Sequence, residues 1–351
     1  MAVATRVSER IERLREQLEE PLLVTSGVNV RYLTGFTSSN AALLVGDDRV
    51  ILFTDFRYIT AARAIPGVEL VQSQGSLLKT VAETLDGRVG FESAVVTYAG
   101  YETLRDGGLE LVPRTSLVES LRAVKDDGEL ATIREAARIT DEVYAAFAEE
   151  RFVGRTERDL AWRLEQLYRE HGAQGLAFEA IVGSGPTGAQ PHGRPTDRVI
   201  EANTTVVVDS GCVVDGYNSD CTRTFATGDL PGDLAEAYDV TLRAQLAGLD
   251  AMRAGTTGHD ADAAARDVIE AAGLGDKFGH GLGHGVGLQV HEAPGARRES
   301  SDTLAPGNVV SCEPGIYLPD RGGVRIEDLV VITDGDPEIL YAYTKELVTV
   351  R

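Results

Sequence analysis

The sequence is short of the residues that crosslink a chain or anchor it in a membrane. Among 351 residues there are three cysteines and one tryptophan, and no two cysteines form a C-x-x-C pair. An odd number of cysteines without such a pair argues against a disulfide framework. No apolar run approaches the roughly 20 residues that span a bilayer, and residues 1–20 form a charged amphipathic pattern without the apolar stretch of a secretory signal. We therefore expect a cytoplasmic protein.

Positive charge is also scarce. The chain has 34 Lys and Arg against 55 Asp and Glu, which gives a formal net charge of −21. A field of that sign repels phosphate backbones and anionic membrane surfaces. We therefore expect neither a nucleic acid nor a membrane as a partner. Part of the acidic excess consists of carboxylates that bound cations would neutralise.

The length predicts more than one domain. A chain of 351 residues exceeds the usual size of one hydrophobic core. Helical patterns cover residues 117–150 and break near Asp126-Asp127, where acidic residues suit the first turn of a helix. We place a domain boundary here, between residues 123 and 124. The predicted fold class is α+β, with a small α/β domain over residues 1–123 and a larger domain over 124–351.

The smaller domain alternates short strand patterns with helical ones. Residues 21–33 and 40–55 are expected to be strands, and Gly46-Asp47-Asp48 is the predicted turn of a hairpin. In the larger domain, strand patterns with glycine-rich connections follow Gly172, interrupted by helical intervals near 232–253 and 259–272. The residues with the most chemistry lie in these strand segments.

Five side chains of the metal-binding type occur in three short segments of the larger domain. Four are carboxylates and one is an imidazole: Asp209, Asp220, His284, Glu313 and Glu327. This is more negative charge than one divalent ion requires, and it suits two cations that share bridging carboxylates. Hydrolases use such a pair of ions to clamp a carbonyl and to generate hydroxide at neutral pH. The sequence therefore predicts a two-metal hydrolase.

The aspartate pair and the glutamate pair repeat one local pattern. In each, a strand ends near the first carboxylate, a turn with glycine follows, and a returning strand carries the second. The turns are expected at Asp215-Gly216 and at Gly322-Gly323. A hairpin brings two such carboxylates within reach of one ion. We expect every ligand to lie on a strand and the two hairpins to face each other.

Glycines surround two of the histidines. His280 and His284 are four residues apart, which on a helix would resemble the zinc motif H-E-x-x-H. The interleaved glycines would each cost a helix about 1 kcal/mol; they are Gly279, Gly281, Gly283, Gly285 and Gly287. We therefore expect an extended segment whose bare face lets a metal or a substrate backbone approach closely.

Together these motifs resemble the Xaa-Pro peptidases, aminopeptidase P and prolidase, of the pita-bread metallopeptidase fold. The matching stretches lie between Pro191 and Asp328 and read A-Q-P-H-G-R-P-T-D, V-V-D-S-G-C-V-V-D-G-Y-N-S-D-C-T-R-T-F, G-H-G-L-G-H-G-V-G-L-Q-V-H-E-A-P, C-E-P-G-I-Y and G-G-V-R-I-E-D. The residues before them are similar to that family's N-terminal domain. The resemblance covers nearly the whole chain. It implies a creatinase/prolidase-like domain over 1–123 and a pita-bread catalytic domain over 124–351.

The resemblance implies a role for each ligand. Asp209 would chelate one ion, Asp220 and Glu327 would bridge both, and His284 and Glu313 would complete the shell of the second. A hydroxide held between the ions would attack the carbonyl of an Xaa-Pro bond. Glu313 would carry the proton from this nucleophile to the prolyl nitrogen, which must be protonated to leave.

Further residues match positions around the substrate. His192 and His291 would steady the tetrahedral intermediate and line the proline pocket. His280 would either support a ligand from behind or contact the substrate. Arg325 is expected to hold the carboxylates through a salt bridge, with substrate contact as the alternative. Phe178 is similar to the family's apolar wall for proline.

One position departs from the family pattern. Prolidases confined to dipeptides place an arginine shortly after the H-E-x-P segment, where it binds the free C-terminal carboxylate. This chain has Gly295 there, and Arg297 and Arg298 follow in what resembles a solvated turn. Loss of a bidentate carboxylate contact weakens the case for strict dipeptidase activity. The choice between Xaa-Pro dipeptides and longer Xaa-Pro peptides stays open.

Two alternative functions are considered. Methionine aminopeptidases share the five-ligand chemistry, but the additional N-terminal domain and the P-H-G-R-P-T-D motif disfavour them. A metal-free pita-bread module that binds a protein partner would have lost at least one ligand. All five are present, as are His192 and His291.

The ligand set favours certain metals. An oxygen-rich site with one nitrogen suits Mn²⁺, while Co²⁺ or Zn²⁺ would also bind; the resemblance favours manganese. It also implies proline-containing peptides or dipeptides as substrates and a homodimer. Cys212, Cys221 and Cys312 each lie within three residues of a proposed ligand. We expect them to be buried as small hydrophobic side chains and not to bind metal.

Overall fold

The computed structural model describes residues 3–351, with side chains from Ser8 onward. Met1 and Ala2, the first residues of the charged amphipathic pattern, lie outside the described residues. Contacts divide the chain into two compact units, one up to Arg122 and one from Ala123 onward. No helix within residues 3–351 combines the length and apolar character needed to cross a membrane.

The first unit is built on a six-stranded sheet with the order β4-β3-β2-β1-β5-β6. The strands are β1 (Leu22–Val24), β2 (Ala41–Val45), β3 (Val50–Asp55), β4 (Glu69–Ser73), β5 (Arg88–Glu92) and β6 (Glu110–Arg114). The helices are α1 (Val3–Arg15), α2 (Gly27–Thr34), α3 (Ile59–Ala62), α4 (Leu77–Thr84), α5 (Tyr98–Asp106) and α6 (Leu117–Ala123), the last ending at the boundary. The apolar faces of α4 and α5 pack on this sheet around Phe53 and Leu104.

One predicted strand of this unit is largely a helix. Only Leu22–Val24 of the interval 21–33 is extended, and α2 follows. The Ser26 side chain accepts a hydrogen bond from the Asn29 N–H, and Gly35 ends the helix at a φ of 72°. These are the usual start and stop signals of a helix, and they override the β-branched pattern. The hairpin turn is confirmed, since β2 pairs with β3 and the Gly46 N–H donates to the Arg49 carbonyl.

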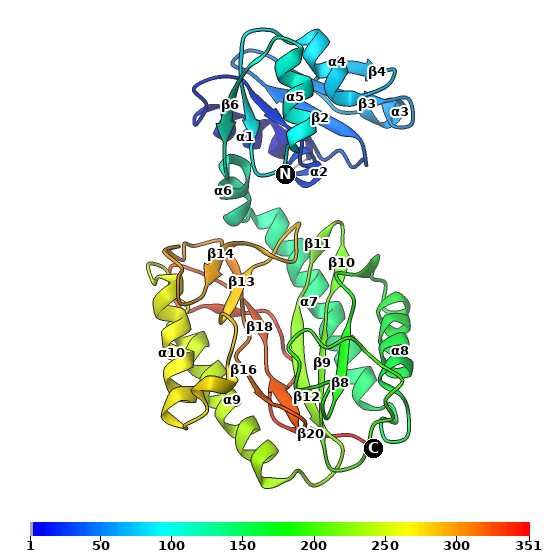
Figure 1. Cartoon of the computed structure of the whole chain (residues 1–351), viewed down its shortest axis with the longest axis vertical. Coiled ribbons are helices and arrows are strands. Elements are labelled where there is room, and N and C mark those ends of the chain that lie inside the picture. Colours follow the sequence, from blue (N-terminus) through cyan, green and yellow to red (C-terminus); the bar gives the residue numbers. More distant parts are fainter. Residues whose placement is uncertain (1–2) are drawn as a thin grey trace. The chain divides into compact units, whose positions relative to one another are not determined.

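The second unit carries long helices around several small sheets (Figure 1). The helices are α7 (Asp127–Ala148), α8 (Glu157–Glu170), α9 (Gly232–Ala251) and α10 (Gly258–Ala271), with a 3₁₀ turn at Gly275–Lys277. The strands are β7 (Gly175–Leu176), β8 (Ile181–Ser184), β9 (Thr205–Ser210), β10 (Cys212–Val214), β11 (Tyr217–Asn218), β12 (Cys221–Ala226), β13 (Gly283–Gly285), β14 (Glu292–Ala296), β15 (Val309–Cys312), β16 (Gly315–Leu318), β17 (Gly322–Arg325), β18 (Asp328–Val331), β19 (Glu338–Ile339) and β20 (Val348–Thr349).

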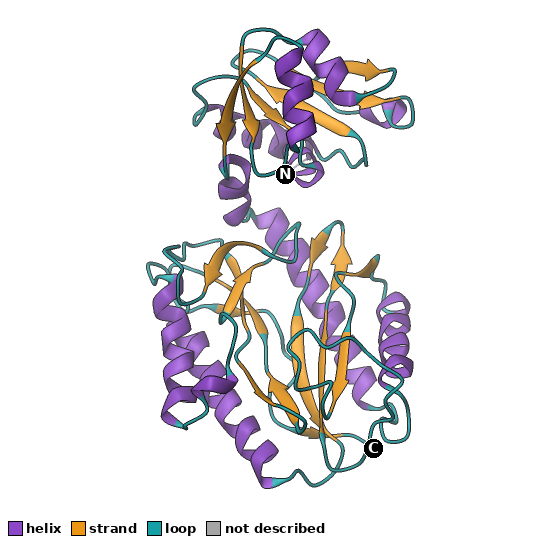
Figure 2. Cartoon of the chain, viewed as in Figure 1, coloured by secondary structure: helices purple, strands orange, loops and turns teal. Residues whose placement is uncertain are grey.

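The helices of the second unit cover its strands from two sides. Figure 2 shows the strands in the middle, with α9 and α10 along one side and α8 along the other. One apolar core joins α7 and α8 to β9 and β12, and a second joins α9 and α10 to β15 and β18. The predicted helix break is confirmed, because Asp126 and Glu129 form a capping box at the start of α7. The strand ends between these two cores position the site.

Candidate metal centre

Each carboxylate pair comes from an outer strand pair that encloses an inner hairpin. β9 pairs with β12, with Asp209 opposite Thr222, and β10–β11 is the hairpin between them. β15 pairs with β18, with Cys312 opposite Asp328, and β16–β17 is the enclosed hairpin. The predicted repeat of paired strands is confirmed, but the position of the second carboxylates and of one turn differs from the prediction. The repeat brings two acidic strand ends to the same place from the two halves of the unit.

The prediction that every proposed ligand lies on a strand is wrong for three of the five residues. Asp209 is in β9 and His284 is in β13, but the other three lie where an outer strand breaks before or after its hairpin: Asp220, Glu313 and Glu327. At these breaks the backbone no longer pairs with the partner strand of its own sheet. The Glu327 N–H donates to the Thr222 carbonyl at 3.1 Å. The break at Glu327 therefore joins the two halves of the unit beside the proposed ligands.

One of the two predicted turns is misplaced. Asp215 and Gly216 form the first turn, both with positive φ, of 41° and 75°, as a type I′ turn requires. The second turn is centred on Asp320, with a φ of 61°, and Gly322-Gly323 belong to β17. A Cβ at Gly323 would lie 2.0 Å from the Gly188 carbonyl oxygen. A Cβ at Gly322 would lie 2.8 Å from Thr205 Oγ1. Close packing of neighbouring groups, and not a turn, explains these glycines.

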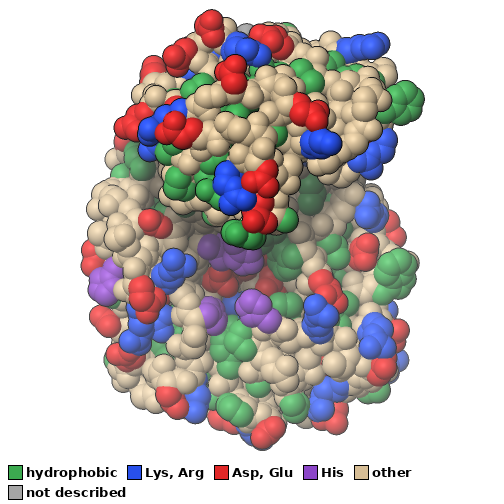
Figure 3. All heavy atoms as spheres, turned by 45° about the horizontal axis from the view of Figure 1, so that its top comes forward, with side chains coloured by type: hydrophobic (Ala, Val, Ile, Leu, Met, Phe, Trp, Pro, Cys, Tyr) green, Lys and Arg blue, Asp and Glu red, His purple; other side chains and the backbone are tan. Residues whose placement is uncertain are grey.

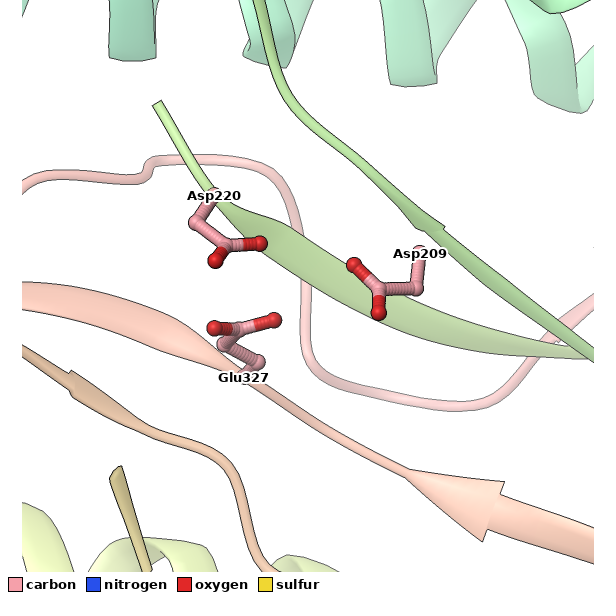
Figure 4. A group of neighbouring side chains, drawn as sticks. All are labelled: Asp209, Asp220 and Glu327. Atoms are coloured by element: carbon pink, nitrogen blue, oxygen red, sulfur yellow. The ribbon is translucent and has the colours of Figure 1, made fainter. Parts of the chain in front are cut away.

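Three carboxylates converge in the centre of the unit (Figure 4). Ligand atoms of Asp209, Asp220 and Glu327 lie within 4.8 Å of one another, and the residues are 9%, 5% and 1% exposed. Asp209 Oδ1 and Glu327 Oε1 are buried and accept no hydrogen bond from the described residues. Buried oxygen atoms without donors are costly unless a cation or water meets them. This donor set therefore fits divalent metal ions.

The electrostatics of the cluster point the same way. Burial raises the pKa of Asp220 and of Glu327 well above the ordinary value, and repulsion from the neighbouring carboxylates adds to it. Burial also raises the pKa of Asp209 against the opposing effect of Arg325. Without cations these groups would hold protons; cations would allow them to ionise together.

His284 and Glu313 form an ion pair beside this cluster. His284 Nε2 lies 3.1 Å from Glu313 Oε1 and 3.8 Å from Asp220 Oδ2. Burial disfavours the charged imidazole, but the hydrogen bond to Glu313 and the nearby carboxylates raise the pKa of His284 to about 9. Burial would raise the pKa of Glu313, but its bond with His284 and nearby positive charges lower it to about 2. A metal ion bound here would replace the imidazole proton.

Arg325 lies behind the cluster and is 3% exposed. Its Nη2 donates to Asp209 Oδ2 at 2.5 Å, and its Nε donates to Thr222 Oγ1 at 3.1 Å. Its Nη1 donates to the Tyr317 hydroxyl at 2.8 Å and to the Pro191 carbonyl at 3.1 Å. The structure thus forms the ion pair expected of Arg325 and uses its remaining donors internally.

Tyr317 is a member of the site that the sequence reasoning missed. Its hydroxyl contacts Arg325 and also lies 2.9 Å from His280 Nε2. Burial raises the pKa of Tyr317, so the hydroxyl keeps its proton at neutral pH. His280 therefore supports the site through Tyr317 and Arg325. The signal was the tyrosine of C-E-P-G-I-Y, four residues after Glu313.

All of the predicted site residues line one cavity of about 510 Å³. They are Asp209, Asp220, His284, Glu313, Glu327, His192, His291, His280, Arg325 and Phe178. The rings of His284 and His291 lie 4.1 Å apart between centroids. Figure 3 shows histidine side chains gathered in a hollow of the surface, with acidic side chains beneath them. The cavity has a carboxylate floor, imidazole walls and an apolar side that includes Phe178 and Ile181.

A buried carboxylate holds the loop that carries His192. Glu157, which is fully buried, accepts from the N–H and hydroxyl of Ser184 at 2.9 and 3.0 Å. Its other oxygen accepts from the N–H and hydroxyl of Thr196 at 3.0 and 2.7 Å. Both ends of the loop are therefore fixed to the first turn of α8.

The glycine-rich segment lines the cavity at Gly281 and Gly283, and its glycines also lie close to the protein's own backbone. A Cβ at Gly283 would lie 1.9 Å from the Ser311 carbonyl oxygen, and one at Gly285 would lie 2.2 Å from the Ala293 oxygen. These atoms belong to the neighbouring strands and their connections. The extended segment is present at β13, but its glycines admit the protein's own backbone.

Arg297 and Arg298 differ in their surroundings. Arg298 pairs with Glu270 at 2.8 Å on the exposed surface, as expected of a solvated turn. Arg297 instead lines the cavity, and its Cζ lies 3.8 Å from where a Cβ on Gly295 would be. The Arg297 guanidinium therefore lies within van der Waals distance of the point where a side chain at 295 would begin. The contacts described for residues 3–351 give it no ion pair.

The three cysteines are free and buried, as predicted. Burial raises the pKa of each thiol, so all three stay protonated at neutral pH. None belongs to the carboxylate group at the centre of the site. They pack as small hydrophobic side chains in the two cores.

Comparison with known proteins gives matches along nearly the whole chain. The model of metallopeptidase family M24 matches residues 131–334, and the creatinase/prolidase N-terminal domain matches residues 10–124. An uncharacterized peptidase of Bacillus subtilis is 41% identical over 97% of this chain and 99% of its own. An Xaa-Pro dipeptidase from Bacillus anthracis has a TM-score of 0.95 at 38% identity and covers 98% of this chain and 100% of its own. An X-Pro aminopeptidase from Thermotoga maritima has a TM-score of 0.88 at 31% identity and covers 97% and 100%.

Proposed function

Because the chain belongs to metallopeptidase family M24, we propose that it is a metallo-exopeptidase that hydrolyses the bond between an N-terminal residue and a following proline. The expected resemblance is confirmed. So is the fold class, a creatinase-type N-terminal domain before a pita-bread catalytic domain. We propose residues 1–123 and 124–351 as these domains.

The observation that carries the proposal is the convergence of buried carboxylates with two unpartnered oxygen atoms at the floor of a histidine-lined cavity. The family implies divalent metal ions, and the donors fit them. We propose two ions per chain, held by Asp209, Asp220, His284, Glu313 and Glu327, with Mn²⁺ as the metal. When bound, such ions lower the pKa of a water molecule and polarise the scissile carbonyl.

The protein's own groups would then move protons and orient the peptide. Glu313 is ionised at neutral pH, since its pKa is lowered to about 2. It can take the proton of the attacking water and pass it to the prolyl nitrogen. Burial lowers the pKa of His291, so its neutral imidazole can donate to the developing oxyanion without bringing in another charge. His192 would flank the same carbonyl, and Phe178 would contact the proline ring.

Arg297 supports a preference among substrate lengths. It supplies a guanidinium, without an ion pair to any described residue, at the wall of a cavity whose floor is acidic. A guanidinium recognises a carboxylate through charge-assisted hydrogen bonds. The solved relative from Bacillus anthracis is named an Xaa-Pro dipeptidase. We propose that this chain prefers Xaa-Pro dipeptides, with Arg297 binding their free carboxylate in place of an arginine at 295.

This proposal is tested with Ala-Pro and Ala-Pro amide. Replacing Arg297→Gln is expected to lower kcat/KM for Ala-Pro about tenfold, because one charge-assisted hydrogen bond of moderate exposure is lost. Hydrolysis of the amide, which has no carboxylate, should stay within twofold. Arg298→Gln is the matched control and should change neither. An equal loss on both peptides would show that Arg297 does not read the carboxylate.

The same observations bear on the two alternative functions, on the cellular compartment and on the oligomeric state. The match to the creatinase/prolidase N-terminal domain disfavours a methionine aminopeptidase, and the complete donor set disfavours a metal-free binding module. Buried, unpaired cysteines are consistent with a reducing compartment, so we propose a cytoplasmic enzyme. We also propose a homodimer, as the family resemblance implies.

A further inference from the structure

A buried ion pair lies behind the glycine-rich segment that carries His280 and His284. Asp262 and Arg266 are one turn apart on α10, and their side chains are 1% and 7% exposed. Arg266 Nε donates to Asp262 Oδ2 at 2.7 Å, and Nη2 donates to Oδ1 at 2.8 Å. The pair does not line the cavity, so the proposed chemistry leaves it without a role.

The pair binds three backbone groups of residues 278–282. Arg266 donates from Nη1 to the Phe278 carbonyl at 3.0 Å and from Nη2 to the His280 carbonyl at 2.7 Å. Asp262 Oδ1 accepts from the Leu282 N–H at 2.9 Å. The guanidinium also lies over the Phe278 ring, 4.1 Å from its centroid. A planar fork and a carboxylate thus fix the segment at successive points.

The attachment continues to two of the proposed metal ligands. The Leu282 carbonyl accepts from the Glu313 N–H at 2.8 Å. His284 follows two residues later, and its N–H donates to Ser311 Oγ at 3.0 Å, which in turn donates to Glu313 Oε1 at 3.1 Å. A displacement of Leu282 would therefore move His284 and Glu313 together.

The segment needs such an attachment because of its composition. Glycines at 279, 281 and 283 lose more conformational freedom on ordering than any other residue, and they supply no side chains to pack. A buried ion pair is often no more stabilising than two apolar side chains of similar volume. Overall stability alone therefore does not account for an ion pair at this place.

We infer that Asp262 and Arg266 are positioning residues that set the placement of His284 and Glu313 for metal binding, without touching metal or peptide themselves. The inference rests on the proposed function, because it takes these two residues to be ligands. It gives two residues of α10 that lie outside the cavity a part in metal binding.

The test is the double variant Asp262→Leu/Arg266→Met, which keeps apolar volume in the core but removes every bond to the segment. Two readouts are measured on metal-stripped protein. Amide hydrogen exchange of Leu282 and Glu313 is expected to accelerate at least about tenfold. The Leu282 N–H loses its acceptor on Asp262, and the Glu313 N–H donates to a Leu282 carbonyl whose segment is no longer held in place. The Kd for Mn²⁺, from calorimetric titration, is expected to rise about 10- to 100-fold, as for other residues that orient metal ligands.

The chain offers a matched control. Asp239 and Arg243 form the same i, i+4 ion pair on α9, at 2.9 Å, but with side chains 69% and 54% exposed. Asp239→Leu/Arg243→Met should leave exchange and metal affinity unchanged. Should the first double variant fail to fold, Arg266→Lys keeps the charge but loses the fork, and it should show the same two effects more weakly.

The outcomes separate this inference from the function beneath it. Faster exchange with unchanged Mn²⁺ affinity would overturn the inference, since the ion pair would then serve the segment alone. Unchanged exchange would overturn it as well. Failure of the wild-type chain to bind Mn²⁺ in the titration would refute the proposed function. The exchange experiment uses metal-free protein, so it would still report whether the ion pair holds the segment.

Discussion

Replacing Glu313→Gln is expected to lower kcat for Ala-Pro by about 10³-fold with Mn²⁺ saturating, within the range that removal of a general acid–base group produces. The amide keeps the size and one ligand oxygen of Glu313 but can neither accept nor deliver a proton. KM should change far less than kcat, because Glu313 is proposed to act on the nucleophile and the leaving nitrogen. Steady-state kinetics by mass spectrometry would measure both.

Metal content has to be followed in the same experiment, since Glu313 is also a proposed ligand. The variant should still bind Mn²⁺ through the remaining donors, and the loss of kcat should persist when added Mn²⁺ no longer changes the rate. Glu236→Gln, on the exposed face of α9, is the control and should retain wild-type kinetics. Recovery of wild-type kcat at high Mn²⁺ would assign Glu313 to metal binding alone.

Metal removal is expected to lower the melting temperature by an amount that grows as pH rises from 5 to 8. The folded-state pKa of Asp220 and of Glu327 is raised above 3.8 and 4.5, and that of His284 is raised from 6.5 to about 9. Groups with raised pKa stabilise the metal-free fold only while protonated, so their contribution is lost as pH rises. Glu313 acts oppositely, but its contribution is lost only as pH falls toward 2 and is constant in this window.

Metal-loaded protein should show the opposite trend, because deprotonated ligands bind the ions more tightly. Free metal at about 1,000 times Kd stabilises the folded state by about 4 kcal/mol per site. For a domain of this size that corresponds to a shift on the order of 10 °C. Calorimetry of loaded and EDTA-treated protein at several pH values would measure the gap. A gap that is absent, or that narrows toward pH 8, would contradict the proposed ligand set.

The convergence of the proposed ligands in one cavity could be predicted from sequence because their chemistry is local. Four carboxylates and one histidine occur in short segments whose strand and turn patterns are legible, and the paired hairpins follow from them. The breaks that hold Asp220, Glu313 and Glu327 were not predicted, because they depend on hydrogen bonds between the two halves of the unit. The second turn was wrongly predicted at Gly322-Gly323 for a similar reason. The close approach of Gly188 to Gly323 is a contact between distant segments, and the local sequence pattern does not show it.

The supporting residues could not be found this way. Glu157, Asp262 and Arg266 lie at least 12 residues from the groups they hold, and no spacing rule connects them. Tyr317 is only eight residues from Arg325, but its motif does not show which group its hydroxyl contacts. The β-branched pattern before Thr34 fits a strand as well as a helix, and only the capping by Ser26 and Gly35 decides for α2. The sequence gives Arg297 the pattern of a solvated residue, whereas the fold places it in the cavity wall beside Gly295.

The most direct test of the central claim is a cleavage assay by mass spectrometry with Mn²⁺-loaded protein. The substrates are Ala-Pro, Ala-Pro-Ala, a longer Xaa-Pro peptide and Met-Ala-Ser, with Glu313→Gln as the inactive control. The account predicts release of the residue before proline, fastest from Ala-Pro, and no release of methionine from Met-Ala-Ser. Faster cleavage of the longer peptides would move the chain to the aminopeptidase side of the family. Absence of any Xaa-Pro hydrolysis by fully metal-loaded protein would contradict the account.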